Sequence, residues 1–354
     1  MSPQGCLSDQ LDMGSNTPCG IFEQSRVGFV CDLVDRKTSV HNFAVSVDEE
    51  ITCFHAALVR PTVGFPSSGP SLEVWAGTWG EAGWLRGIFD AAFGGTCIRP
   101  DGTRKVMVDA GANIGLYGLY FAMQGCEVHA FEPLHVNIDH IRVSVRLNHL
   151  SDRMHIHHMA ATDAEGNVTM RYSRYDTGLT HLVKPGETSR LNSTNWYASG
   201  HHHGHVLATA MEWREHPGVR AARIDTVLTH ELLRGRPIEW LKVDVEGHER
   251  LALCGASALF ARGDVRWVGF ELNYETTSNR DALRIRDFLD ANRMTHRNLK
   301  ALGKIGAWQW DRYLQRKRRG GRDKGYMVTY ERNGSFGMYG QHVDAEAIAD
   351  ACRP

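Results

Sequence analysis

The stretch VMVDAGANIG, residues 106–115, decides how the rest of the chain is interpreted. Its first four residues are typical of a buried strand that ends in a carboxylate, Asp109. Glycines at 111 and 115 allow the backbone to turn sharply and to approach a ligand closely. LYGLYFAMQ, residues 116–124, then continues as a helix. The stretch therefore predicts a strand, a tight turn and a helix, with an acid at the turn.

Strands and helices alternate through the following residues. Strands are predicted at 106–109, 127–133, 154–162, 238–247 and 265–273, and helices at 80–93, 116–124, 135–150, 248–261 and 279–293. This alternation predicts an α/β fold, a doubly wound parallel sheet with helices on both faces. Two further strands, at 295–302 and 325–332, have no helix between them and predict an antiparallel edge.

The pattern divides the chain into two parts. Residues 1–74 form an N-terminal extension, partly strand and partly linker, and residues 75–354 form the α/β domain. An insert at about 171–222 separates the third and fourth core strands and includes HHHGH at 201–205. Loops of that length in a compact domain are usually functional or disordered, so we expect residues 184–205 to be mobile. A solvated loop is the favoured interpretation of the histidines, and a lid over the substrate is the functional alternative.

Composition excludes several classes of protein. The 354 residues carry a net charge of -1, which gives no global electrostatic basis for binding nucleic acid or an anionic membrane. No apolar run has the length of a membrane span, and the N-terminus lacks the features of a secretory signal. The eight cysteines form no CxxC pair, which fits a reducing compartment. A cytoplasmic protein is expected.

Two acids and the glycine turn indicate a nucleoside site. Parallel sheets of this kind bind ligands beyond the carboxyl ends of their strands, where Asp109, Gly111 and Gly115 are expected to lie. Glu132 ends the next strand, at about the 20-residue separation expected of a carboxylate that binds ribose hydroxyls.

The residues around the turn favour a cationic ligand. The dinucleotide pattern G-x-G-x-x-G requires glycine at 113 and 116, where the chain has Asn113 and Leu116. The phosphate-binding pattern G-x-x-x-x-G-K-[ST] is absent as well. An acid directly before the turn would repel a pyrophosphate but suits S-adenosylmethionine, which carries a sulfonium and an ammonium group.

The ordered set of motifs resembles the FkbM-type S-adenosylmethionine-dependent methyltransferases. The similar segments are VDAGANIGLYGLYFA, VHAFEPLHVNIDHI, MAATDAEGNV, IEWLKVDVEGHERLALCGA and VGFELN, within about residues 75–332. The resemblance implies the class I methyltransferase fold, with strand order 3-2-1-4-5-7-6 and an antiparallel last strand. It also implies a cofactor site, whose product state is S-adenosylhomocysteine, formed by Asp109, Gly111, Ala112, Asn113, Gly115, Glu132, Ala161, Asp163 and Asp244.

The block LKVDVEGHE carries the candidate catalytic residues. Strand alternation would place Lys242, Asp244 and Glu246 on one face, which in a buried parallel strand should be apolar. One interpretation is a salt-bridged strand end that caps the next helix with Glu246 and Glu249. The other is that these residues, together with Glu271, border the transferred methyl group.

In a catalytic role the carboxylates would take a proton from the acceptor, and Lys242 would keep them ionised or contact the substrate. Asp244, Glu246 and Glu271 also offer the hard oxygen ligands that Mg²⁺ prefers. Transfer without an obligatory metal is favoured, and a divalent ion remains the alternative. Asp244 can serve the cofactor, the catalysis or both.

The expected reaction is O-methylation of a hydroxyl on a small molecule or sugar, and the resemblance supplies that acceptor class. The alternatives are methylation of nitrogen or carboxyl groups, RNA included, and a non-catalytic protein that keeps the fold to bind a partner. The near-neutral overall charge argues against nucleic acid as the acceptor.

Overall fold

The computed structural model describes most of the chain from residue 82 onward. The described residues are 33–34, 40–47, 50–57, 82–173, 178, 180–183, 213–272, 277–297, 310, 313–315, 326–332 and 344–353. The predicted mobile segment and the histidines at 201–205 lie outside them. Within these ranges, no helix is both long and apolar enough to cross a membrane.

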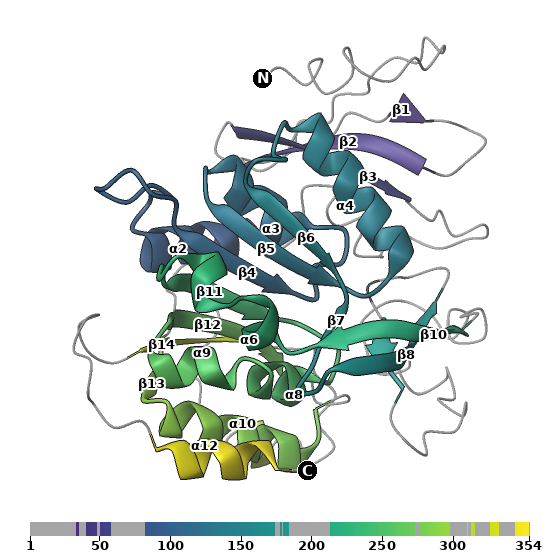
Figure 1. The fold of residues 1–354 in the computed structure, drawn as a ribbon. Helices are drawn as coiled ribbons and strands as arrows, with labels where there is room; N and C mark the ends of the chain where they lie inside the picture. Colours follow the sequence, from purple (N-terminus) through teal and green to yellow (C-terminus); the bar gives the residue numbers. More distant parts are fainter. Residues whose placement is uncertain are drawn as a thin grey trace.

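A seven-stranded sheet forms the centre of the fold (Figure 1). Its strands are β4 (Val106–Ala110), β5 (Glu127–Glu132), β6 (Met154–His158), β11 (Ile238–Val243), β12 (Val265–Leu272), β13 (Met294–His296) and β14 (Tyr326–Arg332). The buried runs of β4 and β11 are apolar apart from a few polar groups, as expected for strands covered on both faces. The α/β class predicted from the alternation is confirmed.

The order of the strands across this sheet is β13-β14-β12-β11-β4-β5-β6. β5, β4, β11 and β12 run parallel, and β14 is antiparallel to both of its neighbours, β12 and β13. The expected order does not describe the strands of the whole chain. The strands of one further sheet precede β4, and the strands of another lie between β6 and β11 in the sequence. Counted along the chain within the seven-stranded sheet alone, the strands stand as 3-2-1-4-5-7-6.

Helices cover both faces of the sheet. They are α2 (Ala82–Phe93), α3 (Leu116–Met123), α4 (His135–Leu147), α6 (Ile224–Val227), α7 (His230–Leu233), α8 (Glu249–Cys254), α9 (Ser257–Arg262), α10 (Asn279–Ala291) and α12 (Ala345–Cys352). Alternate strand residues face opposite sides, so Val108 belongs to the core under α6–α10 and Met107 to the core under α2–α4. The single helix expected at 248–261 is divided into α8 and α9 at Gly255.

A second sheet, which the sequence did not predict, includes strands from the insert and from the residues just before it. β7 (Ala160–Ala161), β8 (Gly166–Ser173), β9 (His181–Leu182) and β10 (Trp213–Ala222) stand in the order β7-β10-β8-β9. The expectation of a loop across 171–222 is therefore wrong for its two ends, which are strands. This sheet lies beside the carboxyl ends of the central strands (Figure 1).

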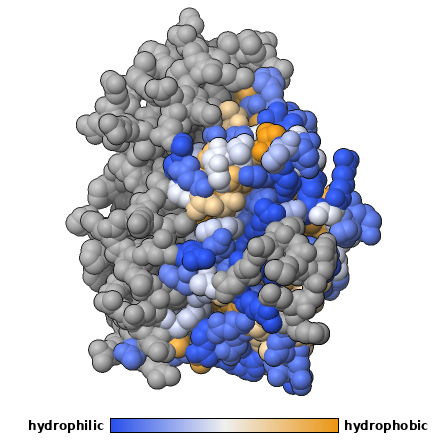
Figure 2. Space-filling view, turned by 90° about the vertical axis from the view of Figure 1, so that its left-hand side faces the viewer, coloured by the Kyte–Doolittle hydropathy of each residue, from blue (hydrophilic) through white to orange (hydrophobic). Residues whose placement is uncertain are grey.

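The described part of the N-terminal extension is a three-stranded antiparallel sheet. β1 (Leu33–Val34) pairs with β2 (Val40–Val47), which pairs with β3 (Glu50–Ala57). β3 runs close to α4 (Figure 1). On the side where the loop before β4 lies, the described surface is mostly hydrophilic, with only a small apolar group (Figure 2).

Among the described side chains, four cysteines form two disulfides. Cys97 pairs with Cys126 across 29 residues, and Cys254 pairs with Cys352 across 98 residues, with Cα atoms 4.7 and 5.5 Å apart. No described cysteine is free. The absence of CxxC pairs, from which a reducing compartment was inferred, did not indicate these bridges, because pairing depends on the fold and not on a short sequence spacing. The second bridge fastens the C-terminal helix α12 to α8.

Candidate functional site

Gly111 lets the turns that follow β4 and β11 pack against each other. Its φ is 80°, and a Cβ placed on it would overlap the backbone carbonyl of Asp244. Only glycine tolerates both conditions without a shift of the backbone. Because both turns follow the carboxyl ends of parallel strands, their contact brings residues from two strands to one place.

Glu132 holds the turn after β4 in place. Its Oε2 accepts the backbone N–H of Asn113 at 2.9 Å, and its Oε1 accepts the N–H of Leu134 at 2.8 Å and the amide of Asn137 at 3.3 Å. The residue is 3% exposed, and burial raises its pKa to about 7 although the hydrogen bonds oppose this. A carboxylate oxygen accepts two hydrogen bonds, so Oε2 has room for one further donor, such as a hydroxyl.

Lys242 and Asp109 form a buried ion pair beneath the turns. Lys242 Nζ donates to the carbonyl of Gly111 at 2.7 Å and lies 3.2 Å from Asp109 Oδ1 and 3.5 Å from Asp244 Oδ2. Asp109 Oδ2 accepts the N–H of Gly118 in α3 at 3.0 Å. Burial raises the pKa of Asp109, and the Lys242 ammonium acts in the opposite direction. Of the two roles expected for Lys242, the geometry matches the charge partner.

Three carboxylates converge where β11 and β12 end. Asp244 and Glu246 lie in the turn after β11, Glu271 lies in β12, and one oxygen from each is within 4.8 Å of the others. Burial raises the pKa of Glu271 well above its ordinary value. The charges of Asp244, Glu246 and Glu249 and a hydrogen bond with Asp244 raise it further. Glu271 can therefore hold a proton, and the three groups offer oxygen ligands for a divalent cation.

The route by which these carboxylates meet differs from the predicted one. β11 ends at Val243, so strand alternation does not extend to Asp244 and Glu246. The backbone turns instead, and Glu246 has a φ of 52°, in the left-handed region. The structure brings Asp244, Glu246 and Glu271 together through a turn and not through a strand face.

Glu249 takes the structural role that the sequence left open for two glutamates. It begins α8, is 2% exposed, and its Oε1 accepts the N–H groups of Val245 at 3.2 Å and Gly247 at 2.9 Å. Burial raises its pKa to about 7, and the charge of Asp244 contributes to that rise. Glu249 thus fixes the turn that carries Glu246, and Glu246 itself faces the pocket.

A pocket lies over the carboxyl ends of β4, β5 and β11. Its lining includes Gly111, Asn113, Glu132, Asp244 and Glu246, which the sequence predicted. The lining also includes residues that sequence reasoning did not single out: Phe131, Pro133, Met170, Thr180, Leu182 and His248. Met170 and Leu182 come from the second sheet, and the unusual length of the insert was the only signal for Leu182 in the sequence. The described lining contains no lysine or arginine.

Other predicted cofactor residues lie at different depths. Ala161 in β7 lines the pocket. Asp163 is outside the described lining, where its Oδ1 accepts the hydroxyl of Thr162 at 3.2 Å. Ala112 is buried in the core, and Gly115, with a φ of 88°, precedes the first turn of α3. Gly115 and Ala112 therefore shape the turn and do not line the pocket.

A comparison with protein families matches residues 109–298 to the Methyltransferase FkbM domain. The matched range includes the turn after β4, the second sheet and the three convergent carboxylates. The chain belongs to the FkbM methyltransferase family. It is a methyltransferase of an S-adenosylmethionine-dependent family, as the motifs predicted. A comparison with curated proteins finds no match.

Solved structures of other methyltransferases are similar at low levels. The N-terminal domain of human METTL16 in complex with SAH is 11% identical, with 70% of this chain and 68% of that chain covered and a TM-score of 0.33. Residues 961–1257 of the StiE O-MT are 10% identical, with 81% and 83% covered and a TM-score of 0.36. A geranyl diphosphate methyltransferase in complex with GPP and sinefungin is 9% identical, with 75% and 84% covered and a TM-score of 0.32. Scores this low carry no argument about substrates.

The side chains that line the pocket suit S-adenosylmethionine, the cofactor of the FkbM family. S-adenosylmethionine supplies an electrophilic methyl group on a sulfonium, next to an ammonium and a nucleoside. Acidic groups at Asp244 and Glu246 suit the cationic part, and the spare acceptor of Glu132 suits a ribose hydroxyl. The apolar surfaces of Phe131 and Met170 suit a base.

Proposed function

We propose that this FkbM methyltransferase methylates a hydroxyl group on a small molecule or sugar. The observation that carries the proposal is the convergence of Asp244, Glu246 and Glu271 beside a pocket whose described lining has no lysine or arginine. An alcohol is a poor nucleophile until it loses its proton, and a carboxylate placed within reach can take that proton.

The three carboxylates would divide the work. Glu246 lines the pocket and would accept the hydroxyl proton while the oxygen–methyl bond forms and the sulfur–methyl bond breaks. Glu271, whose raised pKa favours its protonated form, would donate a hydrogen bond to Asp244 and hold that carboxylate toward the cofactor. Lys242, behind them, balances the charge of Asp244. This arrangement needs no metal, which is why we propose transfer without one.

The proposal is tested by S-adenosylhomocysteine release with three groups of acceptors: sugars and polyols, amines, and carboxylic acids. We expect turnover with a hydroxyl acceptor, and a loss of about 10²–10⁴ in rate for Glu246→Gln with S-adenosylhomocysteine affinity retained. Glu346→Gln, an exposed change on α12, is the control and should behave as the wild type. Turnover confined to amines or carboxylic acids, or normal turnover in Glu246→Gln, would refute the proposed reaction.

The metal alternative has its own test. EDTA treatment should leave turnover unchanged if the carboxylates act as base and orienting groups. Activity lost with EDTA and restored by Mg²⁺ would instead make Asp244, Glu246 and Glu271 ligands of the ion, which their geometry also allows.

A further inference from the structure

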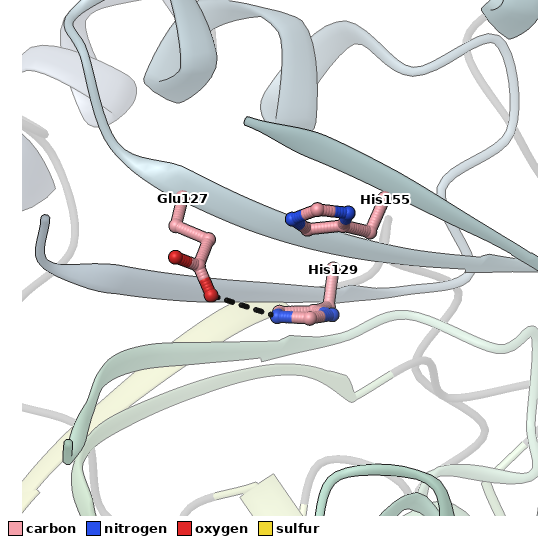
Figure 3. A group of neighbouring side chains, drawn as sticks. All are labelled: Glu127, His129 and His155. Carbon is pink, nitrogen blue, oxygen red and sulfur yellow. Dashed lines mark hydrogen bonds and ion pairs between the residues drawn. The ribbon is translucent and has the colours of Figure 1, made fainter. Parts of the chain in front are cut away.

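A second group of titratable side chains lies on the sheet away from the carboxylates. Glu127 and His129 are two residues apart in β5 and therefore face the same side. His155 in β6 is the direct parallel partner of His129. Figure 3 shows the three side chains together, with the ring of His155 beside that of His129. The ring centroids are 4.9 Å apart.

The distances within this group suit a metal ion. His129 Nε2 and Glu127 Oε1 are 3.3 Å apart, and one ligand atom from each of the three residues lies within 4.8 Å of the others. Two ligands at about 2.0–2.1 Å from a tetrahedral zinc ion are separated by about 3.3 Å. The Glu127–His129 pair therefore already has the spacing of one tetrahedral edge. His155 is exposed, so its ring can rotate toward the same point.

Neighbouring residues orient the buried members of the group. Arg236 contacts both carboxylate oxygens of Glu127 at 2.7 Å. His129 Nδ1 lies 3.1 Å from His157 Nε2, a hydrogen bond that uses the ring nitrogen remote from Glu127. Ligating histidines in metal sites are commonly fixed through their second nitrogen in this way, and ligating carboxylates are themselves hydrogen-bonded. Oε1 keeps a second lone pair for an ion beside Arg236.

We propose that Glu127, His129 and His155 bind a divalent transition-metal ion, with Zn²⁺ as the best match. Two imidazoles and one carboxylate suit zinc and related ions, and Mg²⁺ and Ca²⁺ prefer oxygen ligands alone. The competing explanation is a hydrogen bond from His129 to Glu127 with no ion. The two explanations make different predictions for His155. A metal ion requires the His155 side chain as a ligand, whereas the hydrogen bond between His129 and Glu127 does not.

The ion would hold β5 and β6 together. β6 is the outer strand of the central sheet in the described part of the chain, and it pairs there with β5 alone. A ligand from each strand would fasten this edge. β6 leads directly into β7, whose Ala160 and Ala161 line the cofactor pocket. The site is thus distinct from the pocket but holds one of its walls.

Zinc titration of the full chain tests the site. After treatment with a chelator, Zn²⁺ is titrated calorimetrically into the wild type, His155→Asn and His216→Asn. His155 and His216 are both exposed, so neither change should disturb folding, and His216 lies on β10 outside the group. Zinc bound elsewhere, by other histidines or by the Asp244 carboxylates, is common to all three proteins, and the comparison removes it.

The wild type and His216→Asn should share a binding event that is at least about tenfold weaker in His155→Asn. Co²⁺ should give tetrahedral ligand-field bands in the same two proteins, and zinc should raise their melting temperatures by more than that of His155→Asn. Equal zinc isotherms in all three proteins, or an equal thermal shift in His155→Asn, would overturn the proposal and leave the hydrogen-bonded pair. Either result is independent of methyl transfer.

Discussion

Replacing Glu249 with glutamine tests how a buried carboxyl group contributes to the pH dependence of stability. The hydrogen bonds of this carboxyl offset the cost of its burial only in part. Glu249 Oε1 accepts two backbone N–H groups, and Oε2 receives no hydrogen bond from the described residues. Glutamine keeps an acceptor oxygen for both N–H groups and removes the titratable proton. The variant should therefore fold in the same way and lose one source of pH dependence.

The size of the effect follows from the pKa. The carboxyl titrates near 4.5 when unfolded and at about 7 in the folded chain. Between these values the folded state binds more protons, so its stability advantage is complete below pH 4.5 and is lost as the pH rises through 7. Over the interval from pH 5 to pH 8, the free energy of unfolding should fall by about 2 kcal/mol through this group alone.

Urea unfolding at several pH values between 5 and 8 measures this for the wild type, Glu249→Gln and the control Glu346→Gln. The stability of Glu249→Gln relative to the wild type should rise by about 2 kcal/mol across the interval, because all other titrating groups are common to both proteins. Glu346→Gln should follow the wild type. If the free energies of unfolding of the wild type and Glu249→Gln change equally with pH, the buried carboxyl is ionised across the interval. The raised pKa assigned to it would then be wrong.

Three further outcomes are expected. Gly111→Ala should cost about 3 kcal/mol of stability and abolish S-adenosylhomocysteine binding in calorimetry. The control Gly102→Ala changes a glycine that also has a φ of 80° but has open space around it, and it should cost about 1 kcal/mol. Equal effects of the two changes would mean that the packed turns separate easily. Glu132→Ala should weaken S-adenosylhomocysteine by about 1.5–3 kcal/mol, and unchanged affinity would remove it from the ribose site. Cys352→Ala should lower the melting temperature under oxidising conditions but not in reductant, and an equal loss in both would show that the bridge with Cys254 contributes nothing.

Local patterns in the sequence were sufficient to predict the frame of the site. The strand, the turn and the helix around Gly111 depend on residues close together in the chain, and the structure places them as β4, a left-handed turn and α3. The spacing from that turn to Glu132 was informative because consecutive parallel strands end at one edge of the sheet. The gathering of Asp244, Glu246 and Glu271 followed from the same geometry.

What sequence reasoning missed depends on distant contacts. β10 contains Pro217 and Gly218 at an irregularity in its pairing with β8, and such residues normally indicate a loop. Glu249 binds the backbone of the turn and Glu246 lines the pocket because the turn presents its N–H groups to Glu249. No periodicity in the sequence indicates which glutamate has which role. The partner of Cys254 lies 98 residues away and could not be chosen among the other cysteines from spacing.

The position of β14 affects how the chain folds during synthesis and where it can be truncated. β14 lies between β12 and β13, although it follows both in the sequence. A nascent chain therefore displays an open edge of β12 until residues 326–332 have left the ribosome, and open edges invite pairing with other chains. A fragment cut at the matched boundaries, 109–298, would keep that edge permanently, and the expected product is an aggregate rather than a minimal enzyme.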